Sequence, residues 1–138
     1  MAAKSQQSGF TLVELLVVVA IVGIMAAIAV PQYSAYRIRA YDAAAESDLR
    51  NSITAQEAAF VDEGKYRGCN TPDNCNDPDA GLPGFSPSKL SDGSYALGVF
   101  EHTISEDGQS YKAVAQHRSG SKQFIFDSEV GVITSKRL

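Results

Sequence analysis

Residues 10–30 of the chain read FTLVELLVVVAIVGIMAAIAV, and this stretch decides how the rest of the molecule is organised. Its only polar side chains are Thr11 and Glu14, and the 16 residues from Leu15 to Val30 are all apolar. At about 1.5 Å per residue, a helix of this length covers ~31 Å, which matches the hydrocarbon core of a bilayer. Because such a helix is apolar on every side, it needs lipid or an enclosing protein around it.

Glu14 is the single charge inside this apolar stretch. A carboxylate within a membrane helix costs roughly 2.5–3.5 kcal/mol, so an acid at this place indicates a functional site with a partner of opposite charge. A second interpretation places Glu14 at the level of the lipid headgroups, where the start of a helix favours an acid. Position alone does not decide between the two interpretations.

Composition restricts the class of protein. The chain has 138 residues and a formal charge of −4, which allows about one domain and disfavours nucleic-acid binding by charge alone. The sequence contains no phosphate-binding glycine loop, no nucleophile elbow and no His-Glu metal motif. His102 and His117 stand alone and are predicted to be surface or sheet residues. The sequence therefore predicts no enzyme, no cofactor and no metal site.

The residues from Gly9 onward, GFTLVELLVVVAIVGIMAAIAVPQY, resemble the N-terminal signature of type IV prepilins. The resemblance is dense as far as about Phe60 and weakens after it. The same signature occurs in the pseudopilins of type II secretion and competence systems. A major type IV pilin is the function that the resemblance favours, and a pseudopilin is the alternative.

The resemblance implies a role for five residues near the N-terminus. Gly9 would be the last leader residue, and a prepilin peptidase would cut between it and Phe10. Phe10 would then become the N-methylated first residue of the mature chain. Glu14 would pair with the N-terminal amine of a neighbouring subunit during assembly. Gly23 and Pro31 would bracket a stretch that loosens when subunits move from the membrane into the filament, and Pro31 does remove a helical hydrogen-bond donor.

The same resemblance implies the partners and the location of the protein. The partners would be further copies of the chain in a helical homopolymer, the prepilin peptidase and the inner-membrane pilus assembly machinery. The precursor would lie in the inner membrane and the assembled product would be an extracellular filament. Adhesion, twitching motility, DNA uptake and any nucleic-acid binding would be properties of that filament.

A third hypothesis uses the apolar run differently. Lys4 could belong to the start of a conventional signal peptide, with Ala27-Ile28-Ala29 as the cleavage site and Val30 as the first residue of a secreted binding domain. The embedded Glu14 and the single basic residue before the run argue against this hypothesis.

The helix is predicted to continue well beyond Pro31, because neither proline nor glycine follows until Gly64. The expected helix therefore covers Phe10 to Glu63. Apolar residues at four-residue spacing predict its buried face, and charged residues flank that face. The predicted face is Tyr41, Ala45, Leu49, Ile53 and Phe60, flanked by Asp42, Glu46, Arg50 and Glu57. Glu46 and Arg50 are expected to form an i,i+4 ion pair.

The remaining residues predict a small disulfide-containing head. Cys69 and Cys75 are the only cysteines, and an even count in an exported domain indicates a disulfide, with two free thiols as the alternative. A zinc site would need two further ligands, and the two histidines are distant in sequence. The disulfide is the argument for placing this domain outside the cytoplasm. Residues 71–93 predict a solvated acidic loop, because Pro, Asp, Asn, Gly and Ser dominate there.

Alternating residues predict three to four antiparallel strands at 95–102, 110–117, 122–127 and 130–135, so the expected fold class is α+β, a long helix packed on a small sheet. The expected organisation has four parts: a leader (1–9), a transmembrane or filament-core half of the helix (10–31), an amphipathic half (32–63) and the globular head (64–138).

Overall fold

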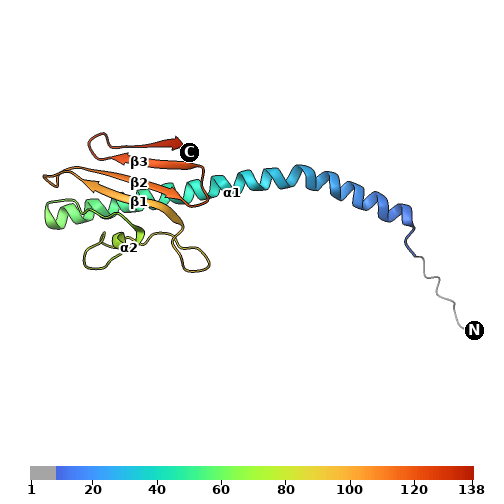
Figure 1. Cartoon of the computed structure of the whole chain (residues 1–138), viewed down its shortest axis with the longest axis horizontal. Coiled ribbons are helices and arrows are strands. Elements are labelled where there is room, and N and C mark those ends of the chain that lie inside the picture. Colours follow the sequence, from blue (N-terminus) through green and yellow to red (C-terminus); the bar gives the residue numbers. More distant parts are fainter. Residues whose placement is uncertain (1–8) are drawn as a thin grey trace, which may run out of the picture. The chain divides into compact units, whose positions relative to one another are not determined.

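The structure is a computed structural model, and it describes residues 9–138. Of the predicted leader, only Gly9 lies within the described residues. The elements are α1 (Leu12–Glu63), α2 (Pro72–Cys75), β1 (Leu97–Ile104), β2 (Tyr111–His117), β3 (Lys122–Asp127) and β4 (Val132–Arg137). The chain divides between Tyr36 and Arg37 into two compact units, which are described separately below. The predicted α+β class is confirmed, and the sheet has four strands (Figure 1).

Helix α1 begins and ends at residues that satisfy its terminal backbone groups. The prediction started the helix at Phe10, but α1 starts at Leu12 because Thr11 caps it from outside the first turn. At the other end the Gly64 N–H bonds the Phe60 carbonyl at 2.8 Å. Gly64 has a φ of 70°, a left-handed conformation that costs a glycine little, so the predicted stop is confirmed.

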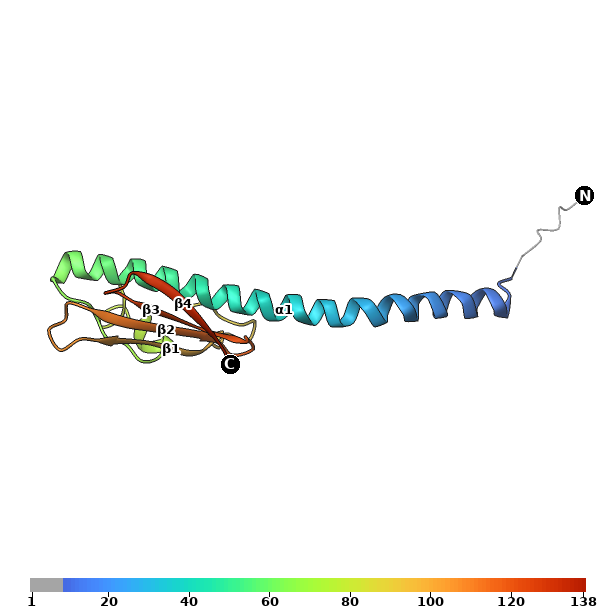
Figure 2. The same ribbon diagram turned by 90° about the horizontal axis from the view of Figure 1, so that it is seen from above.

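The head contains a four-stranded antiparallel sheet in the order β1-β2-β3-β4, each strand pairing with the next in sequence. Figure 2 shows the strands on one side of the C-terminal part of α1. Strands β1 and β4 begin two residues later than predicted. Tyr95 instead forms an isolated bridge with Lys89, and Gly131, with a φ of 72°, belongs to the turn before β4.

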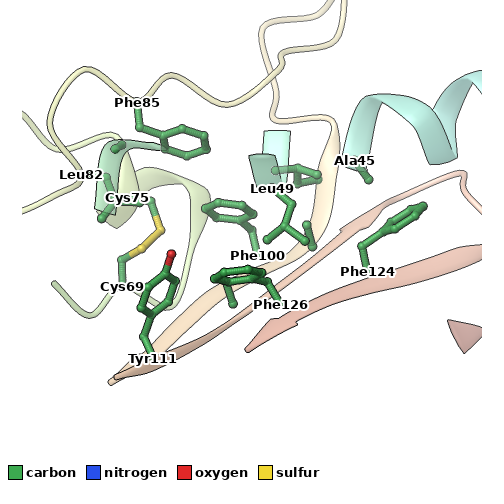
Figure 3. Packing of buried hydrophobic residues seen from close by; sticks show 14 residues of the cluster. Ala45, Leu49, Cys69, Cys75, Leu82, Phe85, Phe100, Tyr111, Phe124 and Phe126 are labelled. Atoms are coloured by element: carbon green, nitrogen blue, oxygen red, sulfur yellow. A yellow bond between two sulfur atoms is a disulfide. The ribbon is translucent and has the colours of Figure 1, made fainter. Parts of the chain in front are cut away.

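The core of the head lies between the sheet, the C-terminal part of α1 and the segment around α2 (Figure 3). Phe85 stacks on Phe100 with ring centroids 5.1 Å apart, and Leu49 and Ala45 of α1 are completely buried. The buried hydrophobic residues of this cluster are Ala45, Leu49, Ala55, Cys69, Cys75, Leu82, Phe85, Leu97, Phe100, Tyr111, Ala113, Ala115, Phe124 and Phe126.

The predicted buried face of α1 is partly wrong. Ala45 and Leu49 are buried, but Tyr41, Ile53 and Phe60 are only half-buried. The buried residues of α1 are Asp42, Ala45, Asp48, Leu49, Ser52, Ala55, Gln56 and Ala59. The face is rotated toward polar residues because loops of the head supply hydrogen-bond donors for them, which a hydrophobicity pattern does not record. The predicted Glu46–Arg50 ion pair is confirmed, at 2.7 Å.

Two further expectations for the head need correction. The loop predicted for residues 71–93 contains the short helix α2, because Thr71 caps it and Pro72 occupies its first turn. His102 and His117 lie in strands as expected but are buried rather than exposed, at 4% and 3% of their full accessibility. Both face α1, where hydrogen-bond or stacking partners are available.

Candidate assembly site

The N-terminal unit exposes its apolar side chains. Phe10 is 86% exposed, and even the least exposed large apolar side chain of this stretch, Ile21, is 48% exposed. By length and composition, α1 is able to cross a membrane. A helix that is apolar all round is not stable in water, so this unit requires a lipid or protein environment.

Thr11 and Glu14 form a capping box at the start of α1. The Glu14 carboxylate accepts hydrogen bonds from the backbone N–H and the hydroxyl of Thr11, both at 2.8 Å and both at Oε2. The Glu14 N–H in turn donates to the Thr11 hydroxyl at 3.2 Å. The box turns the Glu14 side chain back toward the beginning of the chain, beside the backbone that joins Thr11 to Phe10.

Gly9 and Gly23 have no packing reason to be glycine within the described chain. A Cβ added at either position would meet no atom within 4 Å, and neither has a positive φ. A glycine inside a helix costs about 1 kcal/mol relative to alanine. At Gly120, by contrast, a Cβ would lie 2.6 Å from Oδ1 of Asp42. The packing of the chain therefore explains Gly120 but not Gly9 or Gly23.

Pro31 lies inside α1, which is helical on both sides of it. The Ser34 hydroxyl donates to the Pro31 carbonyl at 2.8 Å. Pro31 has no N–H to donate to the preceding turn, so the helix has one backbone bond fewer there. The loosening between Gly23 and Pro31 concerns the assembled state and stays a prediction.

In the head, two buried carboxylates of α1 hold two loops. Asp42 accepts hydrogen bonds from the Ser121 N–H at 2.7 Å, the Ser121 hydroxyl at 2.8 Å and the Lys122 N–H at 3.0 Å. Asp48 accepts from the N–H and hydroxyl of Ser88, at 3.1 and 2.9 Å. Burial raises the pKa of Asp48 even though Ser88 stabilises its charge. These contacts fix the β2–β3 turn and the segment before β1 on the helix.

A third contact between α1 and the head runs through Gln56. Its amide receives the Arg67 N–H at 3.0 Å and donates to the Arg67 carbonyl and to Nδ1 of His102. Nε2 of His102 lies 3.1 Å from the Ser52 hydroxyl, which itself donates to the Leu49 carbonyl. This pattern of hydrogen-bond donors and acceptors fits a neutral His102 with its proton on Nε2. Burial lowers the pKa of His102 to about 4, which keeps it neutral at pH 7.

Cys69 and Cys75 are joined by a disulfide, and the bond is buried in the core. Cys69 also forms an isolated bridge with His102, so the disulfide attaches the segment around α2 to the outer edge of β1. The acidic side chains of this segment lie at the surface, and Asp77 accepts from the Asp79 and Ala80 N–H groups.

The structure thus brings some of the predicted residues together and adds others. Thr11 was missed, although T-x-x-E before an apolar run is the sequence signal of a capping box. Asp42, Asp48 and Gln56 were missed as structural contacts. Their donors lie 40 to 80 residues later in the chain or, for Gln56, in a loop 11 residues on, so no local pattern indicates them.

Residues 4–30 match the family model described as the prokaryotic N-terminal methylation motif. The chain is 40% identical over 107 residues to the type IV major fimbrial protein FimA of Dichelobacter nodosus, covering 78% of this chain and 60% of that protein. It is 43% identical over 102 residues to a fimbrial protein of Pseudomonas aeruginosa, covering 74% and 63%. A shorter match of 43% over 58 residues, covering 42% and 26%, is to the type IV major pilin protein PilA of Myxococcus xanthus.

The match to the N-terminal methylation motif covers residues 4–30, and the exposed apolar part of α1 agrees with it. The chain is similar to type IV major pilins, and the resemblance to the type IV pilin family predicted from its N-terminal residues is confirmed. Type IV pilins are structural proteins rather than enzymes, in agreement with the prediction. The chain spans about three fifths of the length of the first two relatives.

Proposed function

We propose that this chain is the structural subunit of a type IV pilus, held in the inner membrane by α1 before assembly and polymerised by burying that helix among other copies. The observation that carries the proposal is the uncovered apolar surface of residues 10–30, interrupted by one carboxylate. Burying apolar surface contributes about 25 cal/mol per Å², so packing such helices against one another supplies a large driving force.

The processing step follows from the position of Gly9. A peptidase would hydrolyse the Gly9–Phe10 peptide bond with one water, leaving a carboxylate on Gly9 and an amine on Phe10. A methyl group from a sulfonium-type donor would then replace one hydrogen of that amine. Gly9 is exposed and precedes α1, which supports its access to a peptidase. The new amine is protonated near neutral pH and gives the apolar segment a positive charge.

The capping box supports the pairing of Glu14 with such an amine. Thr11 holds the Glu14 carboxylate at the level of the residue that would carry the amine. In a parallel neighbour with a small axial offset, the amine of one copy and the carboxylate of the next would lie at the same depth. Two opposite charges that meet in a low-dielectric interior stabilise each other, whereas either one alone is costly.

The deciding experiment is the intact and N-terminal peptide mass of protein sheared from the surface of producing cells. A chain that starts at Phe10 with one added methyl group supports the proposal. A chain that starts at Val30 would mean a conventionally secreted domain, and processed protein that stays within the cell envelope would favour a pseudopilin.

Two substitutions test the residues. Glu14→Ala is expected to be processed but to give at least about tenfold fewer filaments, because the amine loses its partner. Wild-type filament yield from this variant would contradict the pairing role. Gly9→Leu is expected to block cleavage, since the side chain has room in the chain itself and only the peptidase site would exclude it. Mature-length protein from Gly9→Leu would refute that expectation, and Gly23→Ala serves as a control that should be cleaved normally.

A further inference from the structure

The end of the head where α1 stops is acidic. The β1–β2 turn lies against the end of α1, with the Tyr66 N–H bonded to the Gly108 carbonyl and the Gln109 side chain bonded to the Gly64 carbonyl, both at 3.0 Å. We call this surface the acidic end; its exposed acids are Asp62, Glu63, Asp79, Glu106 and Asp107. The basic residues at or beside this surface are Lys65, Arg67 and Lys112; Arg67 is ion-paired with Glu63, and Lys112 with Asp127.

The acidic end carries a shallow, open depression. Glu63, Asp79, Glu106 and Asp107 line one open depression, together with Lys65 and the Arg67 segment. A depression with carboxylates on its rim can receive a projecting basic surface and bring the charges to within a few ångströms. The surplus of acidic over basic groups on this surface therefore favours a cationic partner.

The opposite end of the head is basic. The β2–β3 turn and the end of β4 meet there. Lys122 of β3 lies opposite Arg137 of β4 in the strand register, and the Leu138 N–H donates to the Ser121 carbonyl at 3.0 Å. In Figure 1 the C-terminus lies at the other end of the sheet from the end of α1. We call this surface the basic end; its basic residues are Arg118, Lys122, Lys136 and Arg137.

The two acidic groups described near the basic end, Asp42 and Asp92, offset only part of the charge of its four basic residues. The Asp42 carboxylate is buried and accepts from Ser121 and the Lys122 backbone. Asp92 lies within electrostatic reach of Arg118. Lys136 and Arg137 are exposed on the last strand, and β4 is an edge strand with no further strand beside it in the sheet that the described residues form.

We propose that the head docks end to end on a second copy of this chain, with the acidic end of one copy against the basic end of another. That other copy is displaced along the filament by about the length of a head, so it is a different neighbour from the one whose amine meets Glu14. The proposal rests on the proposed function, since it concerns contacts within the polymer. The partner is a second copy because the two surfaces have opposite charge and lie at opposite ends of the same unit. A symmetric dimer through either surface would place like charges together, whereas the head-to-tail contact leaves one free surface of each kind and so propagates.

The test reverses the charge of each end in the full-length chain. The acidic-end variant is Asp62→Lys/Glu106→Lys and the basic-end variant is Lys136→Glu/Arg137→Glu; neither includes a side chain that holds a turn or the core. A chain with all four changes restores complementary ends and the wild-type net charge. Glu101→Lys is the control, because Glu101 is exposed in the middle of β1, away from both ends.

Each single-end variant is expected to give about tenfold fewer sheared filaments than the wild type, at equal cellular levels of processed protein. The variant with all four substitutions is expected to recover most of the filament yield, and the control Glu101→Lys is expected to match the wild type. Wild-type filaments should also release subunits faster as salt rises from about 0.05 M to about 0.5 M.

Three results would overturn the docking contact while leaving the pilus function intact. Single-end variants with wild-type filament yield would show that the charges are not used. If one single-end variant loses filament yield and the variant with all four substitutions does not restore it, that end has a different partner, such as a divalent cation or a nucleic acid. Equal loss in Glu101→Lys would show that filaments are sensitive to any added positive charge. Absence of filaments from the wild-type chain would instead remove the proposed function itself.

Discussion

Replacing Asp42 with alanine is expected to loosen the head from α1. Asp42 is 6% exposed, and its carboxylate accepts three hydrogen bonds, from the Ser121 N–H, the Ser121 hydroxyl and the Lys122 N–H, at 2.7, 2.8 and 3.0 Å. The substitution leaves two backbone donors of the β2–β3 turn without this acceptor, and a buried donor that loses its partner keeps the cost of its lost hydration.

The magnitude follows from these contacts. A hydrogen bond to a charged group contributes about 1.5–3 kcal/mol, and the three bonds share one acceptor and so do not add fully. Ser121 and Lys122 are half-buried, so water can reach part of the turn after the change. We therefore expect Asp42→Ala to lower the free energy of unfolding of the head by about 3–5 kcal/mol, a large share of the 5–15 kcal/mol typical of a domain.

The assay is urea unfolding of the full chain in detergent micelles, followed by near-UV circular dichroism of the aromatic core. The matched control is Asp42→Asn, which keeps an oxygen at the position of Oδ1 and is expected to lose only about 1–2 kcal/mol. Equal stability of Asp42→Ala and the wild type would show that the three hydrogen bonds do not stabilise the head, and equal losses for alanine and asparagine would show that the retained oxygen does not matter.

Two further predictions concern buried groups of the sheet. Tyr111→Phe is expected to leave the free energy of unfolding unchanged or raise it by up to about 1 kcal/mol, because the buried Tyr111 hydroxyl has no hydrogen-bond partner among the described residues and points into the core beside the disulfide (Figure 3); a loss above about 1 kcal/mol in the same unfolding assay would contradict this. The pKa of His102 is lowered to about 4 from an ordinary value of 6.5. Between pH 4 and pH 6.5, His102 is therefore protonated in the unfolded chain but neutral in the folded chain. Stability should therefore fall by up to about 3 kcal/mol as the pH drops from 6.5 to 4, and a stability profile in His102→Gln as steep as in the wild type would assign the effect to other groups.

The local elements were predictable because their signals are short in sequence. The apolar run, the uninterrupted helix to Gly64 and the alternating strands each depend on neighbours within a few residues, and all reappear in the structure. The T-x-x-E signal at Thr11 and Glu14 was equally local and could have corrected the start of α1. The resemblance to type IV pilins rests on the same N-terminal stretch.

The buried face of α1 was not predictable in the same way. Asp42 looks like a solvated charge in the sequence, and it is buried because Ser121 and Lys122, some 80 residues later, present donors to it. His102 is buried for a related reason, since Gln56 and Ser52 satisfy both of its ring nitrogens. Hydrophobic periodicity assigns a polar side chain to water and has no means of counting partners from distant segments.

Periodicity and composition act over a few residues, and they were enough to predict the apolar helix, its single embedded carboxylate, the strand pattern and the family resemblance. Three features emerge only in the folded head: the side of α1 that meets the sheet, the polar groups that are buried with partners, and the gathering of acidic and basic residues at opposite ends. The physical reason is that the hydrogen bonds of buried groups and the summed field of a surface both depend on residues far apart in the chain.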